Sequence, residues 1–272
     1  LKKYKNFIFK KIDFIEKKKL SNLFKKNKFD IVIHLAAQAG VRDSIKIPDA
    51  YFKSNFLGFL NLTEISKKFK VKKFIFASSS SVYGDKKKFP LNEIEKIFPK
   101  NIYAATKKIN EDIAKDLSLI SNTKFVGLRF FTVYGNYGRP DMLIYKFLNS
   151  IFSKKKFYLY NYGRHFRDYT HIDDVLNIMD LLIKKKMRKK FEIFNICSNN
   201  PIDISKVILF ILNYLKLNKK IYNIKRNKIE VLKTHGENKK ILKFLKIRIS
   251  KNIYEELPKI IDWYKEHKLW KL

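Results

Sequence analysis

A tyrosine and a lysine four residues apart, Tyr103 and Lys107, have the clearest chemical potential in this sequence. They lie in a stretch, 102–119, with apolar residues at helical spacing, so both side chains lie on one face of a predicted helix. An ammonium beside a phenol favours the phenolate and lowers the tyrosine pKa from about 10. Such a tyrosine can act as general base or acid near neutral pH. In a chain with 15 tyrosines and many lysines, the same spacing is also typical of a surface pair.

Three predicted strands end in small or hydroxyl-bearing residues. They span 29–35, 73–77 and 125–131. The first runs into Ala36 and Ala37, the second into four consecutive serines, and the third into Thr132. In open parallel sheets, ligands bind beyond the carboxyl ends of the strands. These residues therefore predict a site where the backbone approaches a bound cofactor closely and offers a few hydrogen-bond donors.

Strands and helices alternate along the first half of the chain. Helical spacing over 51–69 and 102–119 separates the three strands, and a further strand is predicted at 191–195. This alternation favours an α/β fold, with a doubly wound parallel sheet covered by helices on both faces. The pattern changes after Gly135, where three more helices are predicted. They span 173–185, 205–216 and 253–267.

The 272 residues include 60 Lys+Arg and 25 Asp+Glu, a net charge of +35. Such a surplus can attract nucleic acid or an anionic membrane. The lysines are spread from Lys2 to Lys271, however, among abundant Ile, Asn and Phe. We therefore interpret the charge as compositional and expect no specific nucleic-acid partner and no membrane partner.

Composition also excludes several classes of protein. With 46% hydrophobic and 15% aromatic residues, the chain is not a disordered basic tail. No apolar run reaches the ~18 residues of a membrane helix. Cys197 is the only cysteine, so no internal disulfide forms and a cytoplasmic location is expected. The five histidines lack metal-ligand spacing, so no metal site is expected.

Six motifs occur in order along the chain. They are Leu35-Ala-Ala-Gln-Ala-Gly-Val-Arg42, Ala77-Ser-Ser-Ser-Ser-Val-Tyr-Gly84, Tyr103-Ala-Ala-Thr-Lys107, Leu128-Arg-Phe-Phe-Thr-Val-Tyr-Gly135, Gly138-Arg-Pro-Asp-Met142 and Arg167-Asp-Tyr-Thr-His-Ile-Asp-Asp174. Together they closely resemble the extended short-chain dehydrogenase/reductase family, the NAD-dependent nucleotide-sugar epimerases and dehydratases. The resemblance covers roughly residues 5–268 and is greatest to members that epimerise UDP-glucuronate at C4.

The resemblance implies catalytic roles for three residues. Tyr103 would take the proton of the sugar 4-hydroxyl while a hydride leaves C4 for NAD, and would return the proton after the 4-keto intermediate has turned. Lys107 would hold the nicotinamide ribose and lower the Tyr103 pKa. Ser79 would hydrogen-bond the 4-oxygen; alternatively, it caps the turn after its strand.

Substrate choice follows from the serine run. Related dehydratases and decarboxylases carry acidic residues where this chain has Ser80 and Ser81. Hydroxyls are no general base at neutral pH, but they donate hydrogen bonds to a carboxylate. Ser79, Ser80 and Thr132 are therefore expected to face a sugar carboxylate. Epimerisation of neutral UDP-hexoses remains the alternative reaction, and a non-catalytic fragment the alternative class of protein.

Two arginines are candidates for the substrate diphosphate. A guanidinium forks onto phosphate oxygens, and the resemblance implies this role for Arg167 and Arg139. A surface ion pair is the alternative for each.

The resemblance also implies a set of residues that contact NAD. Asp13 ends an apolar run, 7–9, predicted as the first strand, and would contact the adenine. Phe14 would flank the base and Phe131 the nicotinamide. The remaining cofactor residues would be Ala36, Ala37, Tyr103 and Lys107. Asn55 is expected either to bond backbone or water near the site or to pack within its helix.

The family's opening feature is missing from this sequence. Its members begin with a strand and a loop, Gly-x-x-Gly-x-x-Gly, that lets the backbone approach the NAD pyrophosphate. We therefore expect a fragment whose Rossmann-type sheet lacks its first βαβ portion. Residues 1–135, with 169–196 returning, would form a partial NAD-binding domain, and 136–272 mainly a smaller nucleotide-sugar-binding domain. The resemblance further implies a homodimer, through a four-helix bundle of the helices at 51–69 and 102–119, and a role in polysaccharide biosynthesis.

Overall fold

The computed structural model describes residues 4–225 and 230–268. The chain forms two compact units, each described by itself below. Unit 1 comprises Leu1–Ala77, Asn101–Gly127 and Met187–Glu192, and unit 2 comprises Ser78–Lys100, Leu128–Lys186 and Ile193–Leu272. The sequence predicts a boundary near residue 135 between a cofactor-binding domain and a substrate-binding domain. A division into compact units does not show what each unit binds, so this boundary stays a prediction.

Four strands form the larger sheet. They are β1 (Ile31–His34), β2 (Lys73–Ser79), β3 (Lys124–Phe130) and β7 (Phe191–Ile196). Their order is β1-β2-β3-β7, and β1 pairs with β2 in parallel, from Ile31 opposite Lys73 to His34 opposite Phe76. All four strands coincide closely with predicted ones. The α/β fold with a parallel sheet is confirmed.

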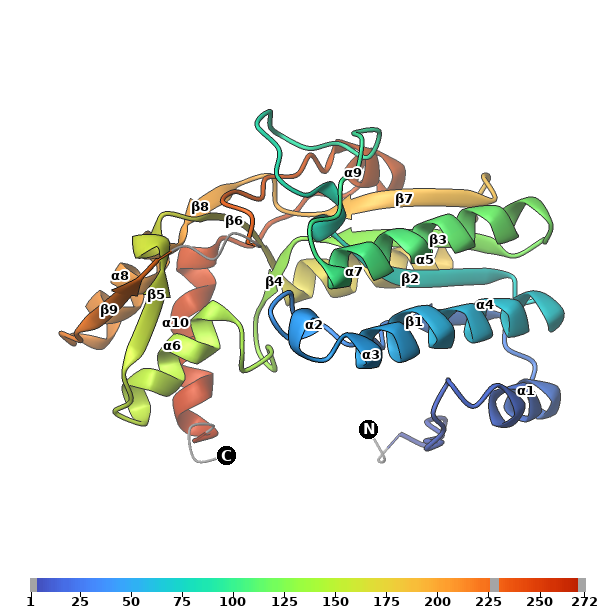
Figure 1. The fold of residues 1–272 in the computed structure, drawn as a ribbon, viewed down its shortest axis with the longest axis horizontal. Coiled ribbons are helices and arrows are strands. Elements are labelled where there is room, and N and C mark those ends of the chain that lie inside the picture. Colours follow the sequence, from blue (N-terminus) through green and yellow to red (C-terminus); the bar gives the residue numbers. More distant parts are fainter. Residues whose placement is uncertain (1–3, 226–229, 269–272) are drawn as a thin grey trace. The chain divides into compact units, whose positions relative to one another are not determined.

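Unit 1 contains six helical segments within its described residues. They are α1 (Lys17–Lys26), α2 (Asp43–Lys46), α3 (Pro48–Tyr51), η1 (Phe52–Gly58), α4 (Phe59–Lys68) and α5 (Ile102–Leu119). Helices α4 and α5 lie side by side (Figure 1). The buried Phe59 of α4 meets Phe74 and Phe76 of β2, with ring centroids 5.8 and 5.3 Å away. These contacts hold α4 against the sheet, and α4 in turn contacts α5, which carries the candidate catalytic pair.

The predicted helix at 51–69 contains a π-helical segment, η1, between α3 and α4. Such segments occur mainly as single-turn bulges and frequently at functional sites. Here the segment holds the buried Asn55, whose bonds are described below.

The predicted first strand at 7–9 is wrong. Residues 7–13 have no regular secondary structure, and Ile8 and Phe9 are exposed by 73% and 67%. A strand requires neighbouring backbone to pair with, and the pairing observed for β1 is with β2. Asp13 instead begins a turn before α1, with its side chain accepting from the Ile15 N–H at 3.0 Å.

Unit 2 contains two smaller sheets and five helices within its described residues. One sheet joins β4 (Thr132–Tyr134), β6 (Phe166–His171) and β8 (Pro201–Asp203), and the other pairs β5 (Phe157–Tyr160) with β9 (Ile221–Ile224). The helices are α6 (Leu143–Phe152), α7 (Ile172–Lys184), α8 (Ile204–Leu215), α9 (Lys239–Leu245) and α10 (Ile253–Glu266), and short 3-10 turns occur at η2 (Ser80–Tyr83) and η3 (Asn161–Gly163). Fully buried residues of α6, α8 and α10, including Phe147, Ile211 and Leu257, form the core.

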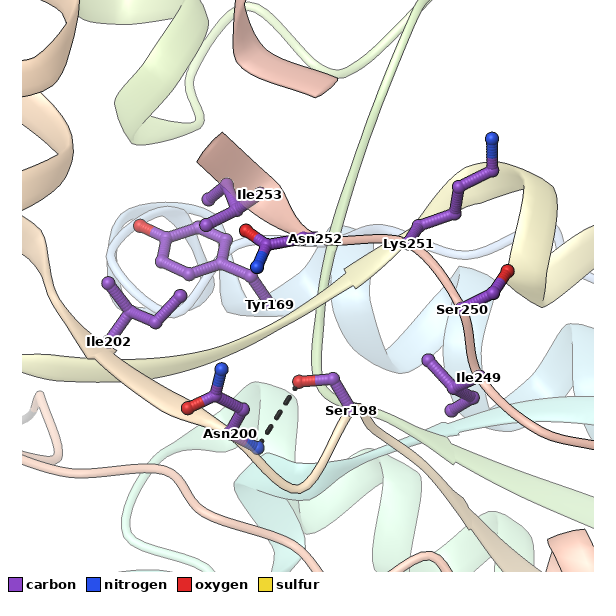
Figure 2. A pocket seen from close by; sticks show the side chains of 9 residues that line it. All are labelled: Tyr169, Ser198, Asn200, Ile202, Ile249, Ser250, Lys251, Asn252 and Ile253. Atoms are coloured by element: carbon purple, nitrogen blue, oxygen red, sulfur yellow. Dashed lines mark hydrogen bonds between the residues drawn. The ribbon is translucent and has the colours of Figure 1, made fainter. Parts of the chain in front are cut away.

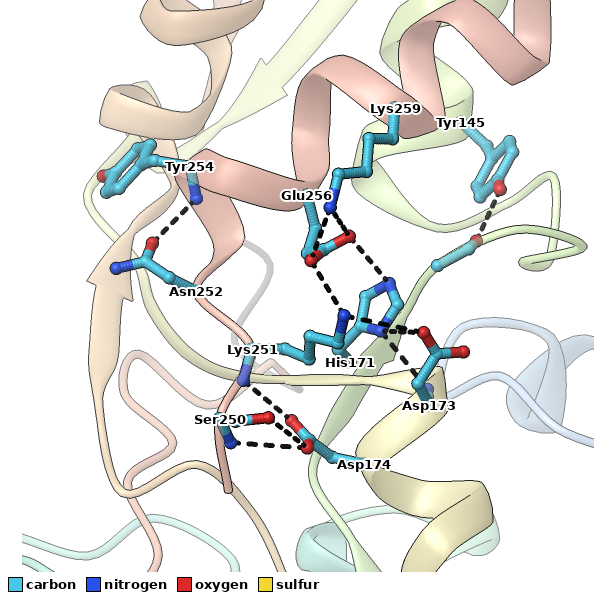
Figure 3. Close-up of polar contacts among 11 residues, drawn as sticks. Tyr145, His171, Asp173, Asp174, Ser250, Lys251, Asn252, Tyr254, Glu256 and Lys259 are labelled. Atoms are coloured by element: carbon cyan, nitrogen blue, oxygen red, sulfur yellow. Dashed lines mark hydrogen bonds and ion pairs between the residues drawn. The ribbon is translucent and has the colours of Figure 1, made fainter. Parts of the chain in front are cut away.

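A buried polar cluster joins β6, α7 and α10 in unit 2 (Figure 3). His171, at the end of β6, accepts the Asp173 N–H at 3.2 Å through Nδ1 and so caps α7. Its Nε2 lies 3.9 Å from Glu256 Oε2, and Glu256 also pairs with Lys251 and Lys259 at 3.2 and 3.0 Å. Burial lowers the His171 pKa, although Asp173 and Glu256 oppose the shift. The cluster ties the strand that carries Arg167 to the last helix.

Gly58 provides a test of how Phe14 is held in unit 1. A Cβ at Gly58 would lie 2.1 Å from the Phe14 ring, so Gly58→Ala must displace the ring. We expect urea denaturation to show a loss of about 1–3 kcal/mol in unfolding free energy. In a Phe14→Ala background the same substitution should cost almost nothing. Equal losses in both backgrounds would contradict the packing described.

Candidate active site

Helix α5 carries both members of the tyrosine–lysine pair. Asn101 caps its first turn, with the side chain accepting from the Ala104 N–H at 2.9 Å. This start places Tyr103 in the first turn and Lys107 one turn later, and the Lys107 Nζ lies 5.9 Å from the centre of the Tyr103 ring. The predicted pair is thus brought together on one helix face.

Lys107 is buried, with only 2% of its surface exposed. Its Nζ donates a 2.8 Å hydrogen bond to the carbonyl oxygen of Ala77, near the end of β2. Burial lowers the Lys107 pKa to about 8, so the ammonium is charged at neutral pH but easily deprotonated above it. The pKa of the buried His34 falls to about 4, chiefly through burial and further through the Lys107 charge.

Asn55 connects the loop after β1 to α5. Its Oδ1 accepts from the Gln38 N–H at 2.7 Å, and its Nδ2 donates to the Gln38 carbonyl at 2.9 Å. The same Nδ2 donates to the Thr106 hydroxyl at 3.1 Å, which in turn donates to the Tyr103 carbonyl at 2.8 Å. The expectation that Asn55 bonds backbone is confirmed. Sequence reasoning missed Gln38 and Thr106, because neither belongs to a chemically reactive pair.

The other cofactor candidates of unit 1 lie around this loop and α1. Ala36 and Ala37 directly follow β1, and the Tyr51 hydroxyl fixes the loop's far end by bonding the Gly40 carbonyl at 2.8 Å. Phe14 packs edge-on against His34, with ring centroids 5.5 Å apart. Asp13 is exposed.

Ser79 belongs to unit 2, and its side chain is buried. Its Oγ accepts from the Ser81 N–H at 3.2 Å, which caps the 3-10 turn η2. The capping role weighed as an alternative is therefore present. It uses an oxygen lone pair, and the hydroxyl proton donates to no acceptor within the described residues. Capping thus leaves Ser79 able to donate a hydrogen bond to a ligand.

Thr132 and Phe131 follow β3 in unit 2. Thr132 opens β4 and is half-buried, whereas Phe131 is buried. The Phe131 ring packs in a cluster with Tyr83, Leu91 and Cys197. Ser80 lies in η2 and is half-buried.

The two arginines differ in their availability. Both Nε and Nη2 of Arg139 donate to the carboxylate of Asp141, so this arginine forms the surface ion pair weighed as its alternative. Arg167 uses Nη1 to donate to the carbonyls of Phe166 and Leu232, at 2.9 and 3.1 Å. Its Nε and Nη2 have no hydrogen-bond partner in the part of the chain that the structure describes. Arg167 can therefore still receive an anion through two donors.

A cavity of about 220 Å³ lies elsewhere in unit 2 (Figure 2). Tyr169 of β6, the loop after β7 and the segment 249–253 line it. None of the residues predicted to bind cofactor or substrate belongs to its wall, so it is a separate feature.

Across residues 4–225 and 230–268, no helix has the length and apolarity to cross a membrane, and no three His, Cys, Asp or Glu side chains group as a metal site.

Comparison with known proteins identifies the family. Residues 2–197 match the sequence model of the NAD dependent epimerase/dehydratase family. The chain belongs to this family. The resemblance described from the six motifs is thereby confirmed.

Relatives and solved structures agree with the assignment. An uncharacterised protein of Methanocaldococcus jannaschii is 40% identical over 100% of this chain and 83% of its own length. A UDP-glucuronate 4-epimerase of Thermodesulfobacterium geofontis is 35% identical over 98% of this chain and 82% of its own. The structure of a Bacillus cereus UDP-glucuronic acid 4-epimerase with UDP-glucuronic acid and NAD has a TM-score of 0.92 at 27% identity, covering 98% of this chain and 84% of the other.

The cofactor of this epimerase/dehydratase chain is NAD, and the residues of unit 1 fit it. Ala36 and Ala37 present no long side chain, so a ligand can approach the backbone. The Lys107 ammonium has three protons, one bonded to Ala77, with no second acceptor within the described residues. It can therefore bind ribose hydroxyls. Asp13, Phe14 and Phe131 stay predictions as cofactor contacts.

Replacing Lys107 tests whether its buried charge lowers the stability of the folded protein. At pH 7 both folded and unfolded lysine are protonated, but folding must bury the charge, so Lys107→Met should raise the unfolding free energy of the cofactor-free protein by about 3 kcal/mol. The gain should shrink as pH rises from about 8, the folded pKa, toward 10.5, the unfolded one. Denaturation at several pH values tests this, with Lys115→Met as control, because Lys115 is an exposed lysine of the same helix. A destabilised Lys107→Met protein would contradict the burial argument.

Proposed function

We propose that the protein is an NAD-dependent UDP-glucuronate 4-epimerase that forms UDP-galacturonate. The observation that carries the proposal is the buried Lys107 ammonium, anchored on the Ala77 carbonyl with its Nζ 5.9 Å from the Tyr103 ring centre, in a chain of the epimerase/dehydratase family. A cation at this distance favours the phenolate. Tyr103 is therefore suited to take up and release a proton.

Each residue then has a defined task in the reaction. NAD, when bound, supplies the hydride acceptor and donor for sugar carbon C4. Tyr103 takes the proton of the 4-hydroxyl as C4 is oxidised and returns it when C4 is reduced. Ser79 donates its hydroxyl proton, unused in capping η2, to the 4-oxygen. Lys107 binds the ribose and keeps the positive charge beside Tyr103.

The uronate preference rests on the serines after β2. Residues 78–81 are all serine, so this segment offers hydroxyl donors and no carboxylate that would repel a sugar acid. Ser80 and Thr132 are both half-buried and are proposed to donate to the C6 carboxylate. Ser79 would lie beside this carboxylate, with its single hydroxyl proton donated to the 4-oxygen. An Asp or Glu side chain in place of Ser80 or Ser81 would instead favour proton transfer or elimination.

Arg167 is proposed to bind the diphosphate through Nε and Nη2. Arg139 can contribute only after it leaves Asp141, because both of its forked donors are engaged there. The net charge of +35 would draw in the anionic substrate, and salt would weaken this attraction.

We further propose a homodimer through the helices at 51–69 and 102–119. Phe52 and Leu57, on the π-helical segment between α3 and α4, are exposed by 50% and 40%. Apolar side chains exposed on a helical segment favour contact with a second copy. We also propose that the enzyme acts in the cytoplasm and that its product serves polysaccharide biosynthesis.

Purified full-length protein supplied with NAD should convert UDP-glucuronate to UDP-galacturonate, measured by chromatography, faster than it converts UDP-glucose. Tyr103→Phe should lower turnover about 10²–10⁴-fold, because the proton acceptor is lost, while nucleotide-sugar binding by calorimetry persists. Turnover of UDP-glucose alone would contradict the carboxylate argument.

Tyr137→Phe is the matched control, since Tyr137 is 84% exposed. It should keep wild-type turnover. Full activity in Tyr103→Phe would instead exclude Tyr103 as the proton acceptor.

A further inference from the structure

The segment 232–237 of unit 2 bridges β6 and the loop around Leu91. On one side, Phe166 N–H donates to the Leu232 carbonyl at 2.9 Å, and Thr234 N–H donates to the Phe166 carbonyl at 3.0 Å. On the other side, Leu91 N–H donates to the His235 carbonyl at 2.9 Å. The segment therefore lies where it can transmit the position of β6 to the cluster that contains Leu91 and Phe131.

Asp168 of β6 is fully buried and bonds two loops at once. Its Oδ1 accepts from the backbone N–H and the hydroxyl of Ser198, both at 2.8 Å. Its Oδ2 accepts from the Gly236 N–H at 3.0 Å, and its own N–H donates to the Thr234 hydroxyl at 3.1 Å. An ionised carboxylate only accepts hydrogen bonds, so it pairs with all three donors, the N–H and hydroxyl of Ser198 and the N–H of Gly236. A neutral side chain of the same size would leave at least one of these donors without a good acceptor.

Gly236 lies directly against Phe131. A Cβ at Gly236 would be 2.4 Å from the Phe131 ring and 2.7 Å from the Cys197 sulfur, closer than packed atoms approach. Phe131 is 6% exposed and Cys197 is fully buried. The backbone at Gly236 is therefore one wall of the space that the Phe131 ring occupies.

We propose that Asp168 is a positioning residue of the enzyme: its carboxylate holds Gly236 against Phe131 and thereby fixes the ring assigned to the nicotinamide. The inference rests on the proposed function and on the prediction that the Phe131 ring flanks the nicotinamide. Asp168 touches neither cofactor nor substrate in this account. It acts through Gly236, with Ser198 keeping the loop of Cys197 in place.

Asp168→Asn tests the proposal with little change in volume. An amide has one acceptor oxygen, so its NH₂ group must face the donors of either Ser198 or Gly236. The sole cysteine of the chain reports the result, because Cys197 reacts with a thiol reagent only when its surroundings open. In the cofactor-free protein at neutral pH, we expect Asp168→Asn to raise the labelling rate of Cys197 at least about tenfold over wild type.

Two further measurements distinguish positioning from simple stabilisation. The NAD affinity of Asp168→Asn, by fluorescence titration, should fall at least about tenfold at a temperature where the variant is folded. Gly236→Ala, which leaves Asp168 intact but pushes on Phe131, should weaken NAD binding similarly. The control is Asp180→Asn, because Asp180 pairs with Lys184 on the exposed surface; it should change neither quantity.

Faster Cys197 labelling with unchanged NAD affinity in both variants would overturn the proposal, since Asp168 would then serve stability alone. Unchanged labelling in Asp168→Asn would overturn it as well. Absence of UDP-glucuronate turnover in the wild-type protein would refute the proposed function, whereas the labelling and NAD-binding results would still decide the role of Asp168.

Discussion

The hydrogen bond from the buried Lys107 ammonium to the Ala77 carbonyl is the constraint on which the rest of the site depends. A charged group taken out of water must be paired or bonded, and the backbone of β2 supplies that bond. The bond fixes α5 to the strand whose next residues are the serines. It also fixes the charge that, in the proposed reaction, favours the phenolate of Tyr103. The lowered Lys107 pKa reflects the free-energy cost of burying this charge.

Buried polar side chains that bond backbone hold irregular segments in each of the two units. Asn55 does so in unit 1, where it joins Gln38 to α5. Asp168 does so in unit 2, where it joins the loops of Ser198 and Gly236. Loops have few backbone partners of their own, so a single side chain with several bonds determines where they lie. The candidate site residues thus lie at strand ends and at the start of a helix, and unreactive polar side chains such as Asn55 and Asp168 hold the neighbouring loops.

The sequence predicted the features that depend on local pattern. The helix at 102–119 coincides with α5, and four strands were placed because runs of Ile, Val and Phe indicate burial. Features that depend on distant partners could not be predicted. Asn55 and Thr106 are 51 residues apart, and Asp168 and Gly236 are 68 apart. The apolar run at 7–9 failed as a strand because pattern alone does not supply a pairing neighbour. Strands β4, β5, β6, β8 and β9 were missed because each has only three to six residues, too few for a clear alternation of apolar and polar side chains.

The proposed epimerase makes one central claim: configuration at C4 is inverted by removal and return of the same hydrogen, while Tyr103 handles only the hydroxyl proton. Incubating the protein and NAD with UDP-glucuronate deuterated at C4 tests this most directly. The account predicts UDP-galacturonate that keeps the deuterium at C4, seen by mass spectrometry and NMR, with no hydrogen gained there from water. Product that has exchanged C4 deuterium with solvent, or a product altered at a carbon other than C4, would contradict it.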